Sequence, residues 1–110
     1  MSRPVIVTPS ISRRIRRDPR FVEATAQRPV DPSWRTDGLC LRQDPELFFP
    51  NSAEDPAPAL AVCARCPVRA PCLAAALDSG EPDGVWGGTT PEERRPMRTV
   101  WLTPRPRVRT

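Results

Sequence analysis

Residues 60–77, LAVCARCPVRAPCLAAAL, decide the fold of this chain, because they hold three of its four cysteines beside a run of apolar residues. The remaining cysteine, Cys40, precedes them, so the full pattern is Cys-x22-Cys-x2-Cys-x5-Cys, with Pro67 directly after the third cysteine. Four thiolates in this order are able to hold one metal centre. We therefore expect the folded domain to be built around Cys40, Cys63, Cys66 and Cys72.

The chain is too short to rely on a large apolar core. It has 110 residues, of which 38% are apolar, and 16 prolines, so it holds one small domain. A domain of this size needs a further constraint. A metal site contributes folding free energy by binding the folded state, whereas two disulfides would restrict the unfolded state.

The N-terminus lacks the apolar run of a secretory signal, and no stretch is long enough to span a membrane. We therefore expect a cytoplasmic protein with no membrane partner. Disulfides persist mainly in oxidising compartments, and free thiols in the cytosol most often bind metal. This compartment favours a metal site over disulfides.

The spacing of the cysteines bears on which metal they hold. Structural zinc sites usually pair their ligands in two close knuckles, whereas here three cysteines lie together and one lies far upstream. A three-plus-one spacing with a proline beside a ligand is closer to ferredoxin-type iron–sulfur runs. The spacing favours an iron–sulfur cluster over zinc, with disulfides third, and leaves all three open.

Capping residues and prolines predict an all-α fold, a small bundle of about four short helices around the cysteine site. Asp31 precedes Pro32, Thr90 and Glu93 match a capping box, and Gly80 is a C-terminal cap. The expected helices cover residues 32–40, a stretch from Ser52 or Asp55 to about 66, residues 71–79, and a short helix from Pro91 that ends before Pro96. Cys72 would then lie in a first turn, where the helix dipole favours a thiolate.

Charge divides the chain into three blocks. Residues 1–30 hold seven Arg and two acids, or +5; residues 31–93 hold four Arg and eleven acids, or −7; residues 94–110 hold six Arg and no acid, or +6. We expect a disordered Arg/Pro-rich arm over 1–30, a cluster-binding domain over 31–95 and a basic tail over 96–110.

Six arginines without an acid favour an anionic partner such as DNA. The candidate DNA-binding residues are Arg94, Arg95, Arg98, Arg105, Arg107 and Arg109. The N-terminal pairs, Arg13-Arg14 and Arg16-Arg17, are nonspecific phosphate contacts at best.

Several segments together resemble the WhiB-like family of actinobacterial regulators, over about residues 31–98. They are Cys40, Asp44-Pro45 through Phe48-Phe49-Pro50, Cys63-Ala64-Arg65-Cys66-Pro67-Val68-Arg69, Cys72-Leu73 with Ala76-Leu77, and Gly84-Val85-Trp86-Gly87-Gly88 followed by Glu92-Glu93-Arg94-Arg95. The resemblance implies one [4Fe-4S] cluster per chain, held by the four cysteines and reactive with oxygen or nitric oxide. It also implies binding to region 4 of the primary sigma factor of RNA polymerase, and action at promoter DNA.

The candidate sigma-binding residues are aromatic residues and the glycine-rich turn. They are Trp34, Phe48, Phe49, Gly84, Val85, Trp86, Gly87 and Gly88. The simpler interpretation is that the aromatic residues form core and that Trp86 packs over the cysteines. Aromatic anchors are enriched at interfaces, so both roles are compatible. We expect the protein alone to be a monomer.

Two rival functions remain at this point. A thiol–disulfide reductase would use the Cys63/Cys66 pair, but the chain has no His to act as base and no βαβ pattern. A structural zinc module that binds nucleic acid is the other rival. We predict a regulator that is not an enzyme, and that binds DNA weakly alone and more strongly with sigma, because its acidic middle block repels phosphates.

Overall fold

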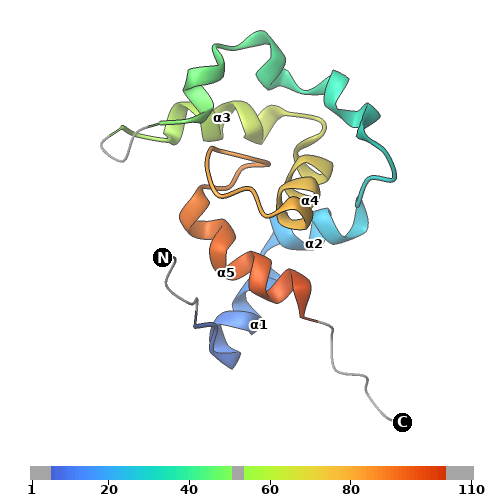
Figure 1. Cartoon of the computed structure of the whole chain (residues 1–110), viewed down its shortest axis with the longest axis vertical. Helices are drawn as coiled ribbons and strands as arrows, with labels where there is room; N and C mark the ends of the chain where they lie inside the picture. The colour runs from blue at the N-terminus through green and yellow to red at the C-terminus, as the bar shows by residue number, and fades with distance from the viewer. Residues whose placement is uncertain (1–5, 51–53, 104–110) are drawn as a thin grey trace.

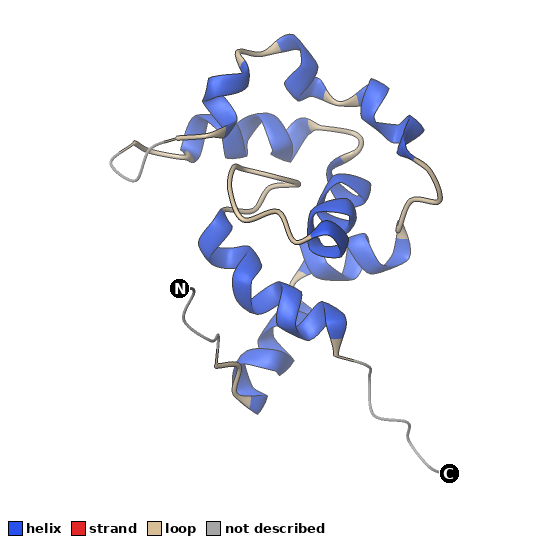
Figure 2. Ribbon diagram, viewed as in Figure 1, coloured by secondary structure: helices blue, strands red, loops and turns tan. Residues whose placement is uncertain are grey.

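The computed structural model describes residues 6–50 and 54–103, which are helical and contain no strand (Figures 1 and 2). Five α-helices and three 3-10 helices follow one another along these residues. They are α1 (Pro9–Arg17), α2 (Pro19–Ala26), η1 (Pro32–Asp37), η2 (Leu39–Arg42), η3 (Pro45–Phe48), α3 (Ala57–Arg65), α4 (Arg69–Ser79) and α5 (Pro91–Leu102). No single helix among them has the length and apolar character needed to cross a membrane; α3 and α4 reach both only together, across a bend of 120°.

Four α-helices, α1, α2, α4 and α5, pack into what we call the helical half. Its core consists of Ile15, Phe21, Ala24, Leu73, Ala74, Leu77, Met97 and Val100. The Phe21 ring also meets the Trp101 ring edge-on, with centroids 5.6 Å apart. Each helix therefore buries one apolar face against the others, which is the main source of stability in a small helical domain.

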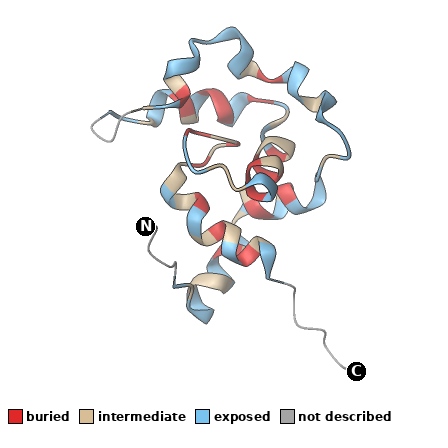
Figure 3. Ribbon diagram, viewed as in Figure 1, coloured by how far each residue is buried: buried red, intermediate tan, exposed pale blue. Residues whose placement is uncertain are grey.

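The three 3-10 helices, α3 and the loop over residues 81–89 form what we call the cysteine half. Its smaller core consists of Phe48, Ala59, Val62, Cys63 and Val85. Neither η1 nor η2 has a buried side chain, and Figure 3 shows most of the η1–η3 ribbon as exposed. The segment from η1 to η3, which we call the η1–η3 arc, therefore buries little apolar surface.

The prediction of a disordered arm over residues 1–30 is wrong for residues 9–26, which form α1 and α2. Thr8 caps α1 through its hydroxyl, which accepts from the Ile11 N–H, and Asp18 caps α2. Pro9 and Pro19 occupy first helical positions, where proline is well tolerated. These prolines begin helices instead of breaking them.

The predicted helix over 32–40 is instead two 3-10 helices separated by Gly38. The Asp31 cap is confirmed, since its carboxylate accepts from the Ser33 N–H at 2.8 Å. Gly38 is extended, and a Cβ there would lie 3.3 Å from Arg35 O and 3.4 Å from Cys40 Sγ. The chain turns at this close approach and carries Cys40 toward the other cysteines.

The helices that carry the other cysteines match their predictions closely. Asp55 accepts from the Ala57 N–H at 2.9 Å where α3 begins, while Ser52 lies outside the described residues. α4 ends at Gly80, which is left-handed with φ of 72°. Both helix ends follow from local capping chemistry.

The prediction that the last helix ends before Pro96 is wrong, because α5 continues to Leu102. Its capping box at Thr90 and Glu93 is confirmed. Pro96 removes one backbone N–H, but Met97 and Val100 beyond it are buried in the helical half. Burial on α4 and α1 offsets the missing hydrogen bond, so the first part of the predicted tail belongs to the core.

Candidate metal centre

All four cysteines line a single cavity of about 380 Å³. They are free thiols; Cys63 and Cys66 are buried, Cys72 is half-buried and Cys40 is exposed. Among the described residues, no three candidate ligands lie close enough together to hold a single metal ion. Four thiols around one cavity are the donor set of a [4Fe-4S] cluster, in which each iron takes one thiolate.

Local structure explains how the cysteines reach this cavity. Cys63 lies in the last turn of α3, and Cys66 ends that helix with its N–H donating to Cys63 O at 3.0 Å. Cys72 lies near the start of α4, where its N–H donates to Val68 O at 2.9 Å. Cys40 arrives separately on η2. The bend at Cys66 and Pro67 thus brings two helix ends to one site, as the spacing predicted.

Backbone N–H groups point at three of the sulfur atoms. The Leu39 N–H donates to Cys66 Sγ at 3.5 Å. The Gly87 N–H donates to Cys72, and the Gly88 N–H donates to Cys63. Hydrogen bonds to ligand sulfur tune the potential of an iron–sulfur cluster. The sequence suggested only partner binding for these glycines, and their N–H groups facing sulfur were not predicted.

The glycine-rich loop requires glycine at the positions that bring it to the cysteines. Gly84, Gly87 and Gly88 have φ of 81°, 55° and 77°, a region that other residues seldom adopt. A Cβ on Gly87 would lie 2.5 Å from Leu73 Cβ and 2.6 Å from Leu73 N. Gly87 therefore lets the loop lie directly on α4, beside Cys72.

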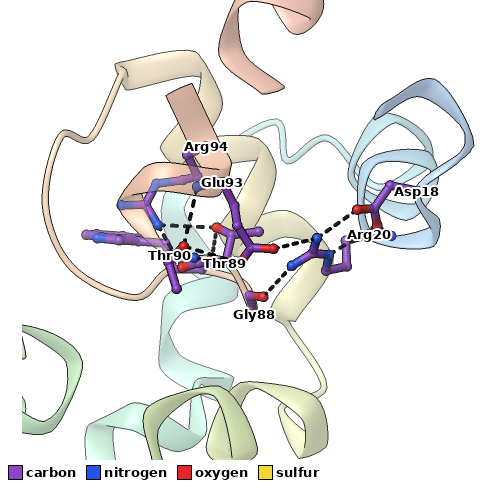
Figure 4. A network of polar contacts seen from close by, with 8 residues as sticks. Asp18, Arg20, Gly88, Thr89, Thr90, Glu93 and Arg94 are labelled. Atoms are coloured by element: carbon purple, nitrogen blue, oxygen red, sulfur yellow. Dashed lines mark hydrogen bonds and ion pairs between the residues drawn. The ribbon is translucent and has the colours of Figure 1, made fainter. Parts of the chain in front are cut away.

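Arg94, on α5, holds this loop in place. Its side chain is 3% exposed, and it donates to Thr89 O at 2.9 Å, Asp83 O at 3.0 Å and Gly84 O at 2.6 Å. Burial lowers the pKa of its guanidinium, and nearby thiols and carboxylates oppose that shift. The prediction that Arg94 contacts DNA is wrong, because its guanidinium is buried and donates to backbone carbonyls. Figure 4 shows its contact with Thr89.

Arg20 of α2 holds the same loop from the other side (Figure 4). It donates to Gly88 O at 2.9 Å and pairs with Asp18 at 2.7 Å and Glu93 at 2.9 Å. The hydrogen bond from Arg20 lowers the pKa of Asp18 despite partial burial. The N-terminal segment therefore supports the loop that faces the cysteines, which the predicted disorder did not foresee.

The apolar candidates divide between surface and core. Trp34, Phe49 and Trp86 line the cavity, and Phe49 is 55% exposed. The Trp86 indole N–H donates to Asp83 O at 3.1 Å, which fixes the ring. Phe48 and Val85 are buried in the cysteine half. The latter two are core residues, as the simpler interpretation proposed, and both also line the cavity; their contact with sigma stays a prediction.

The remaining basic candidates are less constrained. Arg95 is exposed, whereas Arg98 is half-buried and its Nε donates to Leu77 O at 3.1 Å, at the end of α4. Arg98 therefore acts first as a cap on α4. Arg105, Arg107 and Arg109 lie outside the described residues, and their contact with DNA stays a prediction.

Burial raises the pKa of the Cys63 thiol and raises that of Cys72 to about 12, although the N–H groups of Gly88 and Gly87 oppose these shifts. The sequence predicted that the helix dipole favours a thiolate at Cys72, but desolvation is the largest effect on this thiol and favours its neutral form. A bound metal deprotonates a coordinating thiol outright. Cys63 and Cys72 are therefore held as thiolates only together with a cationic centre.

Comparison of the sequence with known proteins identifies its family. The family model for the transcription factor WhiB matches residues 34–97. The chain is similar to the transcriptional regulator WhiB1 of Mycobacterium tuberculosis, with 46% identity over 70 residues, 59% of this chain and 83% of that protein. It is also similar to the transcriptional regulator WhiB of Streptomyces coelicolor, with 42% identity over 65 residues, 59% of this chain and 75% of that protein. WhiB2 of Mycobacterium tuberculosis is 38% identical over 81 residues, 74% of this chain and 84% of that protein.

Proposed function

Because the chain belongs to the WhiB family of transcription factors, we propose that it is a cytoplasmic regulator, not an enzyme, that binds the primary sigma factor at promoters. Cys40, Cys63, Cys66 and Cys72 hold one [4Fe-4S] cluster. One observation carries the proposal: the cavity lined by the four thiols is also lined by Trp34, Phe49 and Trp86. A metal centre and an aromatic protein-binding surface therefore share one site.

The aromatic side chains support a protein partner. Phe49 and Leu41 are 55% and 66% exposed, and both line the cavity. Exposed apolar groups gathered at one place mark interaction sites, and tryptophan is enriched among the residues that dominate binding energy. Region 4 of sigma is the partner that the family resemblance implies. The protein alone is a monomer in this proposal.

The same residues couple the metal site to partner binding. Trp34 lies on η1, Phe49 follows η3, and Trp86 precedes the two glycines whose N–H groups face Cys72 and Cys63. When bound, the cluster supplies a centre that reacts with oxygen or nitric oxide. The aromatic surface keeps its shape only while η2 remains attached through Cys40, so loss of that attachment lowers affinity for sigma.

DNA binding depends on the partner in this proposal. The middle block carries −7, and the described basic residues at the end of the chain include a buried Arg94 and a half-buried Arg98. Few charges are left for phosphates, so the affinity of the chain alone for DNA is low. A complex with sigma supplies the larger share of the affinity for promoter DNA.

Burial argues against the reductase alternative. Cys63 and Cys66 are both buried, and burial raises the pKa of Cys63. Reactive thiols are partly exposed and have a lowered pKa, because the thiolate is the nucleophile. This pair therefore suits metal binding better than attack on another protein's disulfide.

The proposal is tested by titrating sigma region 4 into the anaerobically purified protein by calorimetry. We expect one-to-one binding, a loss of affinity of at least tenfold for Trp86→Ala, and unchanged iron content, since truncating a buried aromatic anchor costs about 2 kcal/mol or more. The control is Leu102→Ala, an exposed apolar residue at the far end of α5. Equal affinity of the Trp86 variant and the native protein would overturn the proposal.

A further inference from the structure

Helix α1 carries a concentration of positive charge that the rest of the fold does not neutralise. Its nine residues include Arg13, Arg14, Arg16 and Arg17 and no acid. Within the described part of the chain, none of these four forms an ion pair, whereas Arg20, Arg28 and Arg69 each pair with a carboxylate. Among the described residues of the N-terminal block, Arg20 and Arg28 are paired, whereas the arginines of α1 are not.

Three of these arginines share one exposed surface. Arg13, Arg14 and Arg17 are exposed and line a shallow hollow together with Ser10, Asp18, Pro19 and Arg20. Arg13 and Arg17 are four residues apart, and Arg14 and Arg17 are three apart, so they are neighbours on the helix. Asp18 is the carboxylate in this hollow, and both of its oxygens already accept from Arg20. The net charge there stays positive.

Like charges at this spacing destabilise a helix. The fold maintains them because the opposite face of α1 is anchored. Ile15 is buried and Ile11 packs against the same core. The apolar face is therefore covered, which leaves α1 no surface with which to enter a membrane. The arginines project from a fixed helix.

The end of the chain leaves the fold beside this helix. Arg16 donates to Thr103 O at 3.2 Å, and α1 packs along α5. Figure 1 shows α1 and the end of α5 at one end of the molecule, while η1–η3 and α3 lie at the other. Arg105, Arg107 and Arg109 follow Thr103 directly in the sequence. The arginines of α1 and the last described residues of α5 thus lie at the end away from the cysteine cavity.

We propose that Arg13, Arg14 and Arg17 of α1 form a binding surface for the phosphate backbone of double-stranded DNA. Guanidinium groups match phosphate oxygens with two hydrogen bonds each, and such contacts position a protein on DNA without reading sequence. Double-stranded DNA is the polyanion that a transcription factor meets at a promoter, and in this respect the inference rests on the proposed function. With a protein bound at the cavity, the α1 surface remains free to meet the same DNA.

The test compares two double variants that change charge equally. Arg14→Gln/Arg17→Gln removes two α1 arginines, and Arg42→Gln/Arg65→Gln removes two exposed, unpaired arginines of the cysteine half. Glutamine keeps helix propensity. Binding of the full chain to a mixed-sequence 30-base-pair duplex is measured by fluorescence anisotropy over a series of salt concentrations. Iron content of each variant confirms folding.

We expect the α1 variant to lower the slope of log affinity against log salt by about 1.8, for two contacts at about 0.9 each, and the control variant to leave it unchanged. Equal slopes for the two variants would overturn the inference. The inference would also be overturned if the α1 variant lost binding to anionic phosphatidylserine vesicles while its binding to DNA stayed intact. Because the assay uses the chain without sigma, failure of sigma binding would overturn the proposed function and not this surface.

Discussion

The helical half and the cysteine half are stabilised in different ways. The helical half buries an apolar face of each of its four helices, including Leu73, Leu77 and Met97 at 3% exposure or less. In the cysteine half, η1 and η2 bury no side chain, and one of the few core residues is the ligand Cys63. The helical half therefore folds by burial, while in our proposal the arc that carries Cys40 depends on a metal centre held by the four thiols.

The largest effect follows from removing one ligand. Cys40→Ser should release the η1–η3 arc, because structural metal sites contribute a large part of folding free energy in small domains. We expect amide hydrogen exchange over 39–48 to lose its protection, and exchange over 73–77 and 97–100 to change less than tenfold. Hydrogen exchange with mass spectrometry measures both regions in one sample. Native-like protection of 39–48 in the variant would remove the distinction between the halves.

Two core truncations test whether the two halves also differ in stability in the metal-free protein. Leu77→Ala should lower the free energy of unfolding by about 2–5 kcal/mol, as for a fully buried leucine. Phe48→Ala should leave the urea midpoint of the metal-free protein unchanged, since its arc is already released. Urea unfolding followed by circular dichroism gives both values. Equal destabilisation would show that the two cores unfold as one unit without metal.

The glycine-rich loop joins the two halves. Two alanine substitutions in it distinguish the cost of steric overlap by an added Cβ from the cost of a positive φ. Gly87→Ala places a Cβ 2.5 Å from Leu73 Cβ, whereas the nearest atom to a Cβ on Gly88 is Cys63 Cβ, at 3.9 Å. Both positions have positive φ. We expect a cost of about 1–2 kcal/mol for strain in each and about 1–3 kcal/mol more for overlap at Gly87.

Thermal unfolding of the metal-loaded protein measures this difference, and the rate of iron release to a chelator reports the site itself. Gly87→Ala should melt at a lower temperature and release iron faster than Gly88→Ala. Matching behaviour of the two variants would mean that the loop does not press on α4.

The smallest effect concerns the ion pair between Arg20 of α2 and Glu93 of α5, beside the loop. Burial opposes ionisation of Glu93, but hydrogen bonds from Arg20 and Thr90 lower its pKa below the ordinary value. A lowered carboxyl pKa stabilises the folded state above the unfolded pKa, near 4.5, and that stability is lost as pH falls through the folded value. Because the pair is partly exposed, we expect no more than about 1 kcal/mol.

Glu93→Gln keeps the capping box possible and removes the charge. In metal-free protein, the loss of stability between pH 6 and pH 3 should be smaller in this variant than in the native chain, as read from urea midpoints. An identical pH dependence would mean that Arg20 holds the loop through Gly88 O alone.

Local chemistry predicted the elements that begin and end with strong caps. The capping box at Thr90, the left-handed Gly80 and the start of α3 at Asp55 each depend on neighbours in sequence. The helices α1 and α2 were missed because the prolines and arginines of this segment are typical of disorder, although Ile11 and Ile15 of α1 are spaced for one helix face. Burial against α4 and α5, which the local sequence does not reveal, decides that they form.

The site was predicted in part for a similar reason. The four cysteines share one cavity, as their spacing indicated. Arg94 was assigned to DNA because it begins a basic run, but its place five residues after Thr89 turns it inward under the loop. The N–H donors at Gly87 and Gly88 depend on positive φ values. Three glycines around one tryptophan are the only signal in the sequence that hinted at them.

We propose that the four thiols hold an iron–sulfur cluster, and that this cluster keeps the cysteine half attached to the helical half. The most direct test is to purify the protein without oxygen and measure iron, sulfide and zinc per chain together with visible absorption. We predict about four iron and four sulfide per chain, with a visible band that bleaches in air or nitric oxide. One zinc per chain, without sulfide or a visible band, would contradict the account.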